Sequence, residues 1–150
     1  MGLRNKVKLE FLSRPENVAL ARVTVATVAA EVDFNLSDIE EIKVAVSEAV
    51  SNAVIHGYEE RTNGIITLTV NLYTDRLEII IEDAGKGIED LNRALQPGSG
   101  SDPERMGLGF VFMKSFMDEV DIWTEVGKGT RVKLVKSLPG VCKIQNCVRN

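Results

Sequence analysis

The sequence has little that would direct it to a membrane, to nucleic acid or to a secretory route. Its longest apolar-rich stretch, residues 18–32, is interrupted by Arg22 and Glu31 and does not predict a membrane span. The first residues lack the apolar core of a secretory signal. A net charge of -4 offers no basic footprint for nucleic acid. We therefore expect a cytoplasmic protein without direct contact with nucleic acid or membrane.

Cysteine and histidine are also scarce. Cys142 and Cys147 lie in a polar segment after Pro139, and the only histidine, His56, is far from them in sequence. A zinc site would need two further ligands, so we expect no metal or redox function from these cysteines. The chain has 150 residues, of which 44% are hydrophobic and 27% charged, as in one soluble domain. We expect this domain to cover residues 1–138, followed by a poorly ordered tail over residues 139–150.

Apolar residues alternate with polar ones in several segments, which predicts strands. The expected strands cover residues 6–12, 64–73, 76–82, 119–126 and 130–136, and the last four form two hairpins. Helices are expected between them, and this order predicts an α+β fold. The specific expectation is a two-layer α/β sandwich with helices on one face of a mixed, mainly antiparallel sheet.

Two capping boxes predict where helices begin. Ser13 with Glu16 is expected to start the first helix, and Ser37 with Glu40 a second one that runs to about His56. Further helices are expected over residues 88–95 and 108–117.

Glu48 and Asn52 lie one turn apart in the second predicted helix, so their side chains project from the same face. An asparagine oxygen suits Mg²⁺, which takes few protein ligands and several phosphate oxygens. A glutamate one turn earlier can orient or deprotonate an attacking hydroxyl. Taken alone, such a pair is more typical of a solvated helix face. His56 follows at the helix end, where an imidazole has a structural use, and we assign it no catalytic role.

Two glycine turns complete the pattern. In the first, Asp83 precedes Gly85 and Gly87, which permit a sharp turn and the close approach of a flat ring. The acid can accept a hydrogen bond from an exocyclic amino group, which adenine has. In the second, Gly107-Leu108-Gly109 is expected to open a helix whose free N–H groups attract phosphate. Each turn alone is also typical of a surface loop without a ligand.

Residues near the second glycine turn supply two further expectations. Arg105 precedes it and can pair with a terminal phosphate. The glycine-rich residues 98–103 predict a lid that closes over a bound nucleotide. Together, the pair Glu48 and Asn52 and the two glycine turns supply the parts of a magnesium-nucleotide site.

In this order, the patterns E-x-x-x-N, D-x-G-x-G and G-x-G resemble the Bergerat ATP-binding fold, which gyrase, histidine kinases and MutL share. More narrowly, the chain resembles the anti-sigma F factors of sporulating bacteria, over about residues 6–136. The segments that carry this likeness are ARVTVA (21–26), VSEAVSNAVIHGY (46–58), ERMGLGF (104–110), SFMDEV (115–120) and GKGT (127–130).

The resemblance implies a homodimeric protein serine kinase that also inhibits an RNA polymerase sigma factor of sporulation, sigma F. Such a protein uses Mg-ATP to phosphorylate a serine of an anti-anti-sigma protein. The unphosphorylated form of that substrate displaces the sigma factor.

The resemblance also implies roles for individual residues. Glu48 matches the catalytic carboxylate, and Arg105 a nearby arginine. Asn52 matches the magnesium-binding asparagine, and Arg22 an arginine of the partner-binding surface. The other implied nucleotide contacts are Asp83, Gly85, Gly87, Gly107, Leu108, Gly109 and Thr130.

Three alternatives stay open. An anti-sigma B kinase of a stress response would share the nucleotide site, although ARVTVA and SFMDEV favour the sporulation branch. The catalytic domain of a histidine kinase is disfavoured because no helical hairpin with a phosphoacceptor histidine precedes the first strand. A module that binds nucleotide without turnover would not need Glu48 beside Asn52. The lid is also shorter and more glycine-rich than is usual in the family, which puts its individual phosphate contacts in doubt.

Overall fold

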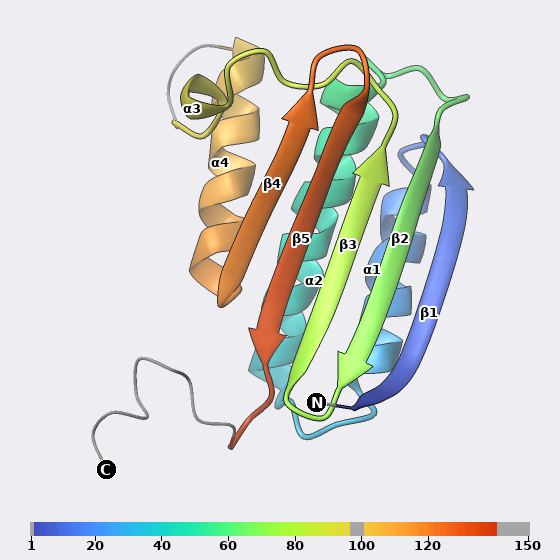
Figure 1. Ribbon diagram of the computed structural model, residues 1–150, viewed down its shortest axis with the longest axis vertical. Coiled ribbons are helices and arrows are strands. Elements are labelled where there is room, and N and C mark those ends of the chain that lie inside the picture. Colours follow the sequence, from blue (N-terminus) through green and yellow to red (C-terminus); the bar gives the residue numbers. More distant parts are fainter. Residues whose placement is uncertain (1, 97–100, 141–150) are drawn as a thin grey trace.

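The computed structural model describes residues 2–96 and 101–140, and for residues 101–105 it describes the backbone alone. The helices α1, α2 and α4 lie on one face of a five-stranded sheet (Figure 1). The strands are β1 (Leu3–Leu12), β2 (Ile65–Tyr73), β3 (Arg76–Asp83), β4 (Glu119–Glu125) and β5 (Gly129–Ser137). The helices are α1 (Asn17–Ala29), α2 (Leu36–Asn52), the π-helical turn η1 (Ala53–Gly57), α3 (Leu91–Ala94) and α4 (Ser101–Phe116). The expected α+β sandwich and both hairpins are confirmed.

The strand order is β1-β2-β3-β5-β4, and all four pairings are antiparallel. The parallel pairing that a mixed sheet implies is therefore absent from the described residues. The reason is the return path of the chain. Strands β3 and β4 run in the same direction, but the tight β4–β5 hairpin places β5 between them (Figure 1).

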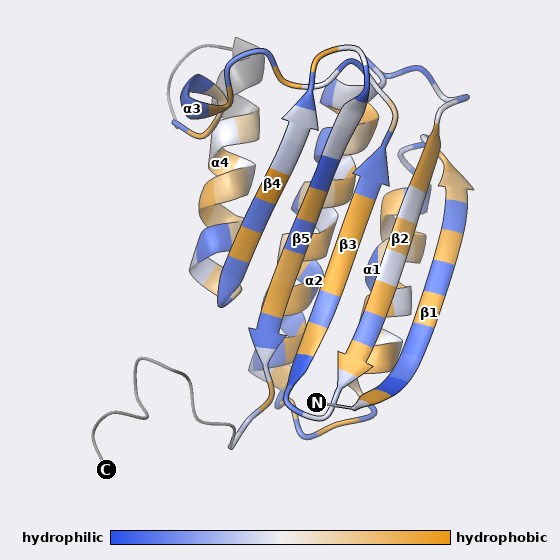
Figure 2. Ribbon diagram, in the orientation of Figure 1, coloured by the Kyte–Doolittle hydropathy of each residue, from blue (hydrophilic) through white to orange (hydrophobic). Residues whose placement is uncertain are grey.

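The core lies between the central strands and the helices. Apolar side chains on the helix-facing side of β2 and β3 are almost completely buried, and these strands carry the apolar bands in Figure 2. They are Ile66, Leu68, Val70, Leu72, Leu77, Ile79 and Ile81. Burying each of them contributes on the order of 1.5–3 kcal/mol before entropy is counted. On α2, the buried residues include Ile42, Val46 and Ala49, which form one apolar stripe at helical spacing.

Both predicted capping boxes are wrong, although both helices exist. Helix α1 has Glu16 as its N-cap without a side-chain cap. Ser13 is fully buried instead, and its Oγ donates to Arg61 O at 2.5 Å and accepts from Gly64 N at 3.0 Å. The box of α2 is formed one half-turn earlier by Asn35 and Asp38, at 2.7 and 3.1 Å. A serine two residues further on is then already inside the helix.

Helix α4 begins earlier than expected. It starts at Ser101 rather than near Leu108, so Gly107 and Gly109 lie inside the helix and do not open it. Pro103 is compatible with this early start, because proline is tolerated in the first turn of a helix, where its missing N–H has no partner to lose. Within the described residues, no helix combines the length and the apolar character that a bilayer crossing requires.

Candidate nucleotide site

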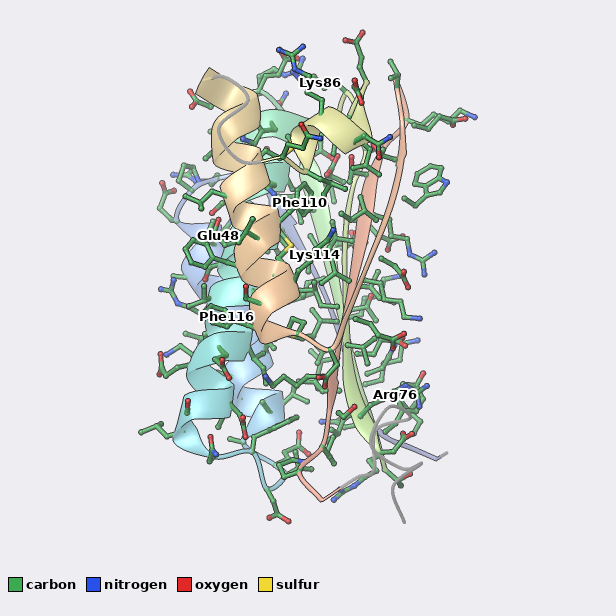
Figure 3. All side chains as sticks on the ribbon, turned by 90° about the vertical axis from the view of Figure 1, so that its left-hand side faces the viewer. Glu48, Arg76, Lys86, Phe110, Lys114 and Phe116 are labelled. Atoms are coloured by element: carbon green, nitrogen blue, oxygen red, sulfur yellow. The ribbon has the colours of Figure 1, made fainter. Side chains whose placement is uncertain are left out.

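Glu48 and Asn52 share the face of α2 that is directed toward α4. A methyl group added to Gly109 of α4 would lie 2.9 Å from Glu48 Oε2 and 3.6 Å from Asn52 Nδ2. Figure 3 shows Glu48 on α2 beside α4. The predicted common face is therefore confirmed, and the structure adds the helix that faces it. A methyl group at this crossing would have to displace the end of the Glu48 side chain.

Asn52 has an unsatisfied polar atom. Its Nδ2 is buried and has no hydrogen-bond partner among the described residues. An orphaned buried polar group costs about 1–3 kcal/mol unless a ligand or water satisfies it. Asn52 is also the last residue of α2, directly before the π-helical turn η1. Such turns are frequent at functional sites because they interrupt the regular helix.

The chemistry around Asn52 fits Mg²⁺ only together with other ligands. No three acidic, histidine or cysteine side chains gather into a metal site in the described part of the chain. The amide of Asn52 can present its oxygen by rotation about its last bond. A metal held here would take its remaining ligands from phosphate and water, which is how Mg²⁺ is usually bound.

Asp83 ends β3 on the helix-facing side of the sheet. Its Oδ1 accepts a hydrogen bond from Gly85 N at 2.9 Å. Burial raises the pKa of its carboxyl from 3.8 to about 6, while the backbone N–H groups of Gly85 and Thr130 oppose the rise. A carboxylate that is costly to bury and faces a pocket suits a ligand that donates hydrogen bonds to it.

The turn after Asp83 needs glycine at two positions. A Cβ on Gly85 would overlap the carbonyl oxygen of Gly57, to which Lys86 N donates at 2.9 Å. Gly87 has a φ of +77° and packs against the backbone of Glu125. The turn is therefore held tightly between η1 and the β4–β5 hairpin, as the glycine pattern predicted.

Two adjoining cavities surround this turn. An outer chamber of about 570 Å³ is lined by residues that include His56, Lys86, Arg93 and Met106. An inner pocket of about 20 Å³ reaches Asn52, Asp83 and Thr130. His56, Gly87, Ile88 and Met106 line both cavities, so the inner pocket lies directly behind the outer chamber.

Sequence reasoning missed two residues that shape the site. Tyr58 is buried, and its Oη accepts from Ala84 N at 2.7 Å and donates to Ile65 O at 2.6 Å, which fixes the start of the turn. Thr124 Oγ1 accepts from Ile88 N at 2.8 Å and fixes the end of the turn. Tyr58 ends the segment 46–58 that carries the family resemblance, but neither residue belongs to the glycine and acidic patterns from which the site was predicted.

The other predicted residues have different outcomes. Arg22 is partly buried on α1, and its Nη1 donates to Ser47 Oγ at 3.3 Å, next to Glu48 in sequence. Gly107 is buried and Leu108 is half-exposed within α4. The side chain of Arg105 lies outside the described residues, as do residues 98–100 of the predicted lid, Cys142 and Cys147.

Residues 11–136 match the family model of the histidine kinase-like ATPase domain. The RsbU and RsbW domains of a Mycobacterium tuberculosis protein share the fold at a TM-score of 0.64 and 22% identity, over 92% of this chain and 34% of that one. A histidine kinase domain of Erythrobacter litoralis shares it at a TM-score of 0.56 and 20% identity, over 83% of this chain and 60% of that one. The chain spans about a third and three fifths of these two structures.

Curated relatives are more similar. An anti-sigma F factor of Clostridium acetobutylicum is 46% identical over 89% of this chain and 94% of its own length. An anti-sigma F factor of Anoxybacillus flavithermus is 44% identical over 91% of this chain and 94% of its own length. The chain therefore belongs to the histidine kinase-like ATPase domain family and, within it, to the anti-sigma F factors.

Proposed function

We propose that this chain is a protein serine kinase that uses Mg-ATP and also binds and inhibits a sigma factor of the sigma F type. The observation that carries the kinase proposal is the position of Glu48. Its carboxylate lies one helical turn from Asn52 and faces Gly109, the residue at which a methyl group would be 2.9 Å from Oε2. A site that only bound nucleotide would not need a carboxylate there.

Adenine is proposed to occupy the inner pocket with its amino group directed to Asp83. In the ionised form this carboxylate is a pure acceptor, which complements the donor N–H of adenine. Thr130 lines the same pocket and places a hydroxyl beside the acid. An inner pocket of about 20 Å³ is much smaller than a purine ring, so its lining has to open when the base enters. We propose that Met106, which lines both cavities, is one of the side chains that move.

The triphosphate is proposed to pass between Asn52 and the glycines of α4. In the helical conformation the N–H groups of Gly107 and Gly109 donate hydrogen bonds to carbonyl groups one turn earlier, so they are not available to phosphate. To bind phosphate, the first turns of α4 have to unwind so that the helix begins at these glycines. Each glycine lowers the stability of the helix by about 1 kcal/mol relative to alanine, which makes this change easier.

Magnesium on Asn52 would neutralise phosphate charge in the bound complex. The chain itself positions the acceptor serine and manages its proton. Glu48 takes the proton as the serine oxygen bonds to the γ-phosphorus, and the bond from that phosphorus to the bridging oxygen breaks to release ADP. Arg105, two residues before Gly107, is proposed to stabilise charge on the transferred group. Most of the catalysis is positioning and charge stabilisation.

Glu48→Gln tests the proposed role directly. The variant keeps the size of the side chain and loses the base, so ATP affinity should stay within about threefold while phosphotransfer falls at least about a hundredfold. Calorimetry measures the first quantity, and transfer of labelled phosphate to the anti-anti-sigma protein measures the second. Undiminished transfer would refute the role of Glu48. The phosphate should be acid-stable, because a histidine kinase would give an acid-labile product.

The partner proposals rest on the family. We propose a homodimer that sequesters sigma F, with Arg22 on the partner-binding surface and the anti-anti-sigma protein as competitor. In a purified system with ATP, sigma F should co-elute with the chain, and the unphosphorylated competitor should release it. Co-elution that Arg22→Ala leaves unchanged would argue against the surface. We place the functional domain in residues 1–138 and assign no role to the tail.

A further inference from the structure

Exposed apolar side chains continue the contact between Glu48 and Gly109 along helices α2 and α4. Val44 lies one turn before Glu48 on the same face of α2, and Phe112 lies about one turn after Gly109 on the same face of α4. The exposed fractions are 38% for Val44 and 36% for Phe112. Both residues are therefore accessible to a molecule that approaches Glu48 along the two helices.

A second contact between the helices shows how they are aligned. Lys136 Nζ donates to Phe116 O at 2.6 Å and forms an ion pair with Glu41 Oε1 at 3.5 Å, so Glu41 and Phe116 lie at the same level. Seven residues separate Glu41 from Glu48 on α2, and seven separate Gly109 from Phe116 on α4. The helices thus run antiparallel and stay in step between the two contacts.

Val44 and Phe112 lie between these two contacts, on either side of the line where α2 and α4 meet. Phe112 stacks on Phe116, with ring centroids 6.1 Å apart and 22° between the ring planes. We call Val44, Phe112 and Phe116 the apolar strip. In Figure 3, Glu48 and Phe116 lie on the side of α4 away from the sheet. Contiguous exposed apolar side chains next to a site are typical of a surface that binds another protein.

The proposed nucleotide site lies on the other side of Glu48. Asn52, one turn after Glu48, lines the inner pocket, whereas Val44 is one turn before it. In phosphoryl transfer the attacking and leaving oxygens are roughly in line, on opposite sides of the phosphorus. With the leaving ADP on the Asn52 side, the acceptor serine approaches from the Val44 side. The segment that carries the serine then lies over the apolar strip.

We propose that the apolar strip is a docking surface for the protein substrate and binds an apolar side chain within four residues of the acceptor serine. Val44 is about 5.4 Å along α2 from Glu48, which is one helical turn. In an extended segment the second residue from the serine lies on the same side at about 7 Å, and in a helical segment the third or fourth lies at about 5–6 Å. This inference rests on the proposed kinase and deepens it by stating what its substrate must carry.

Phe112→Ala and Val44→Ser each remove part of the strip. The KM for the anti-anti-sigma protein should rise about tenfold in Phe112→Ala and less in Val44→Ser, because truncating an aromatic anchor of an interface typically costs that much. The kcat and the affinity for ATP should stay within about twofold, since binding of the substrate is lost and not the chemical step. Val111→Ser is the matched control. Val111 is also 38% exposed, but it is two residues from Gly109 and points to nearly the opposite side of α4.

A double-mutant cycle identifies the side chain that docks. Each apolar residue of the substrate within four positions of the serine is replaced by serine in turn. One replacement should raise the KM of wild type about as much as Phe112→Ala does, and add little when the two are combined. These substrate variants leave the kinase chain intact, so the test does not depend on the stability of Phe112→Ala.

Three results would overturn the proposal. They are an unchanged KM in both strip variants, an equal rise in Val111→Ser, and additive effects for every substrate residue. Absence of phosphate transfer by wild type would instead refute the proposed kinase, and this inference with it.

Discussion

Gly109 lies against Glu48 so closely that a methyl group on it would be 2.9 Å from Oε2 of the carboxylate. Carbon and oxygen do not approach to that distance without repulsion. Where helices α2 and α4 cross, α4 thus has a glycine, whose side chain is a single hydrogen atom. The glycine keeps the space at Glu48 open for the group that the carboxylate serves.

Gly109→Ala should separate activity from stability. Alanine inside a helix stabilises it by about 1 kcal/mol relative to glycine, so the melting temperature should not fall strongly. The methyl group displaces Glu48, and misplacing a catalytic group by about 1 Å costs roughly a hundredfold in rate. Initial rates of phosphate transfer test this, with Gly2→Ala as the control because nothing lies within 4 Å of its added methyl. An unchanged rate would mean that Glu48 does not act from its present position.

Asp83 should make the free protein less stable as the pH rises. Burial raises the pKa of its carboxyl from 3.8 to about 6, so the folded state holds the proton more tightly than the unfolded state. The resulting stabilisation is complete below about pH 4 and is lost as the pH rises through about 6, a change of roughly 3 kcal/mol. Asp83→Asn has no such titration. Urea unfolding should therefore show the variant to be more stable above pH 6, with the difference shrinking toward pH 4.

Affinity for ATP should change in the opposite sense. The ionised carboxylate is the better acceptor, so wild type should bind ATP more tightly at pH 7.5 than at pH 5. At pH 5 about a tenth of the carboxyl is ionised for a pKa of about 6, which limits the loss to about tenfold. Asp83→Asn shares every other titration, including that of ATP, and serves as the matched control. Identical pH profiles for both proteins would contradict a contact between Asp83 and the base.

The sequence predicted what depends on repeating patterns. Alternation located the strands, and the spacing of Glu48 and Asn52 placed both on one helix face. It placed Gly109 in the same site but did not predict its close contact with Glu48, because helix crossings depend on packing between distant segments. Thr124 was missed for the same reason, since its partner Ile88 is 36 residues away in sequence.

The sequence signals for the start of a helix are ambiguous where two possible capping boxes overlap. Residues 35–40 contain Asn35 with Asp38 and, two residues later, Ser37 with Glu40. The first pair forms the box in the structure. Phe34, just before it, is buried, so the entry of the chain into the core fixes where the helix starts. The same kind of tertiary contact draws Ser13 away from α1 and onto the loop at Arg61 and Gly64.

Three alanine substitutions test this reading of the helix starts. Asn35→Ala removes the side chain that accepts from Asp38 N at 2.7 Å and should lower the free energy of unfolding by about 1 kcal/mol. Ser37→Ala, at an exposed position inside the helix, should change it by less than about 0.5 kcal/mol. Ser13→Ala removes two hydrogen bonds between a buried side chain and the backbone of Arg61 and Gly64, and should cost about 1–3 kcal/mol. Urea denaturation ranks the three variants by their loss of unfolding free energy. A larger loss at Ser37 than at Asn35 would mean that Ser37 and Glu40 form the capping box instead. None of the three residues lines either cavity, so ATP affinity should be unchanged in all of them.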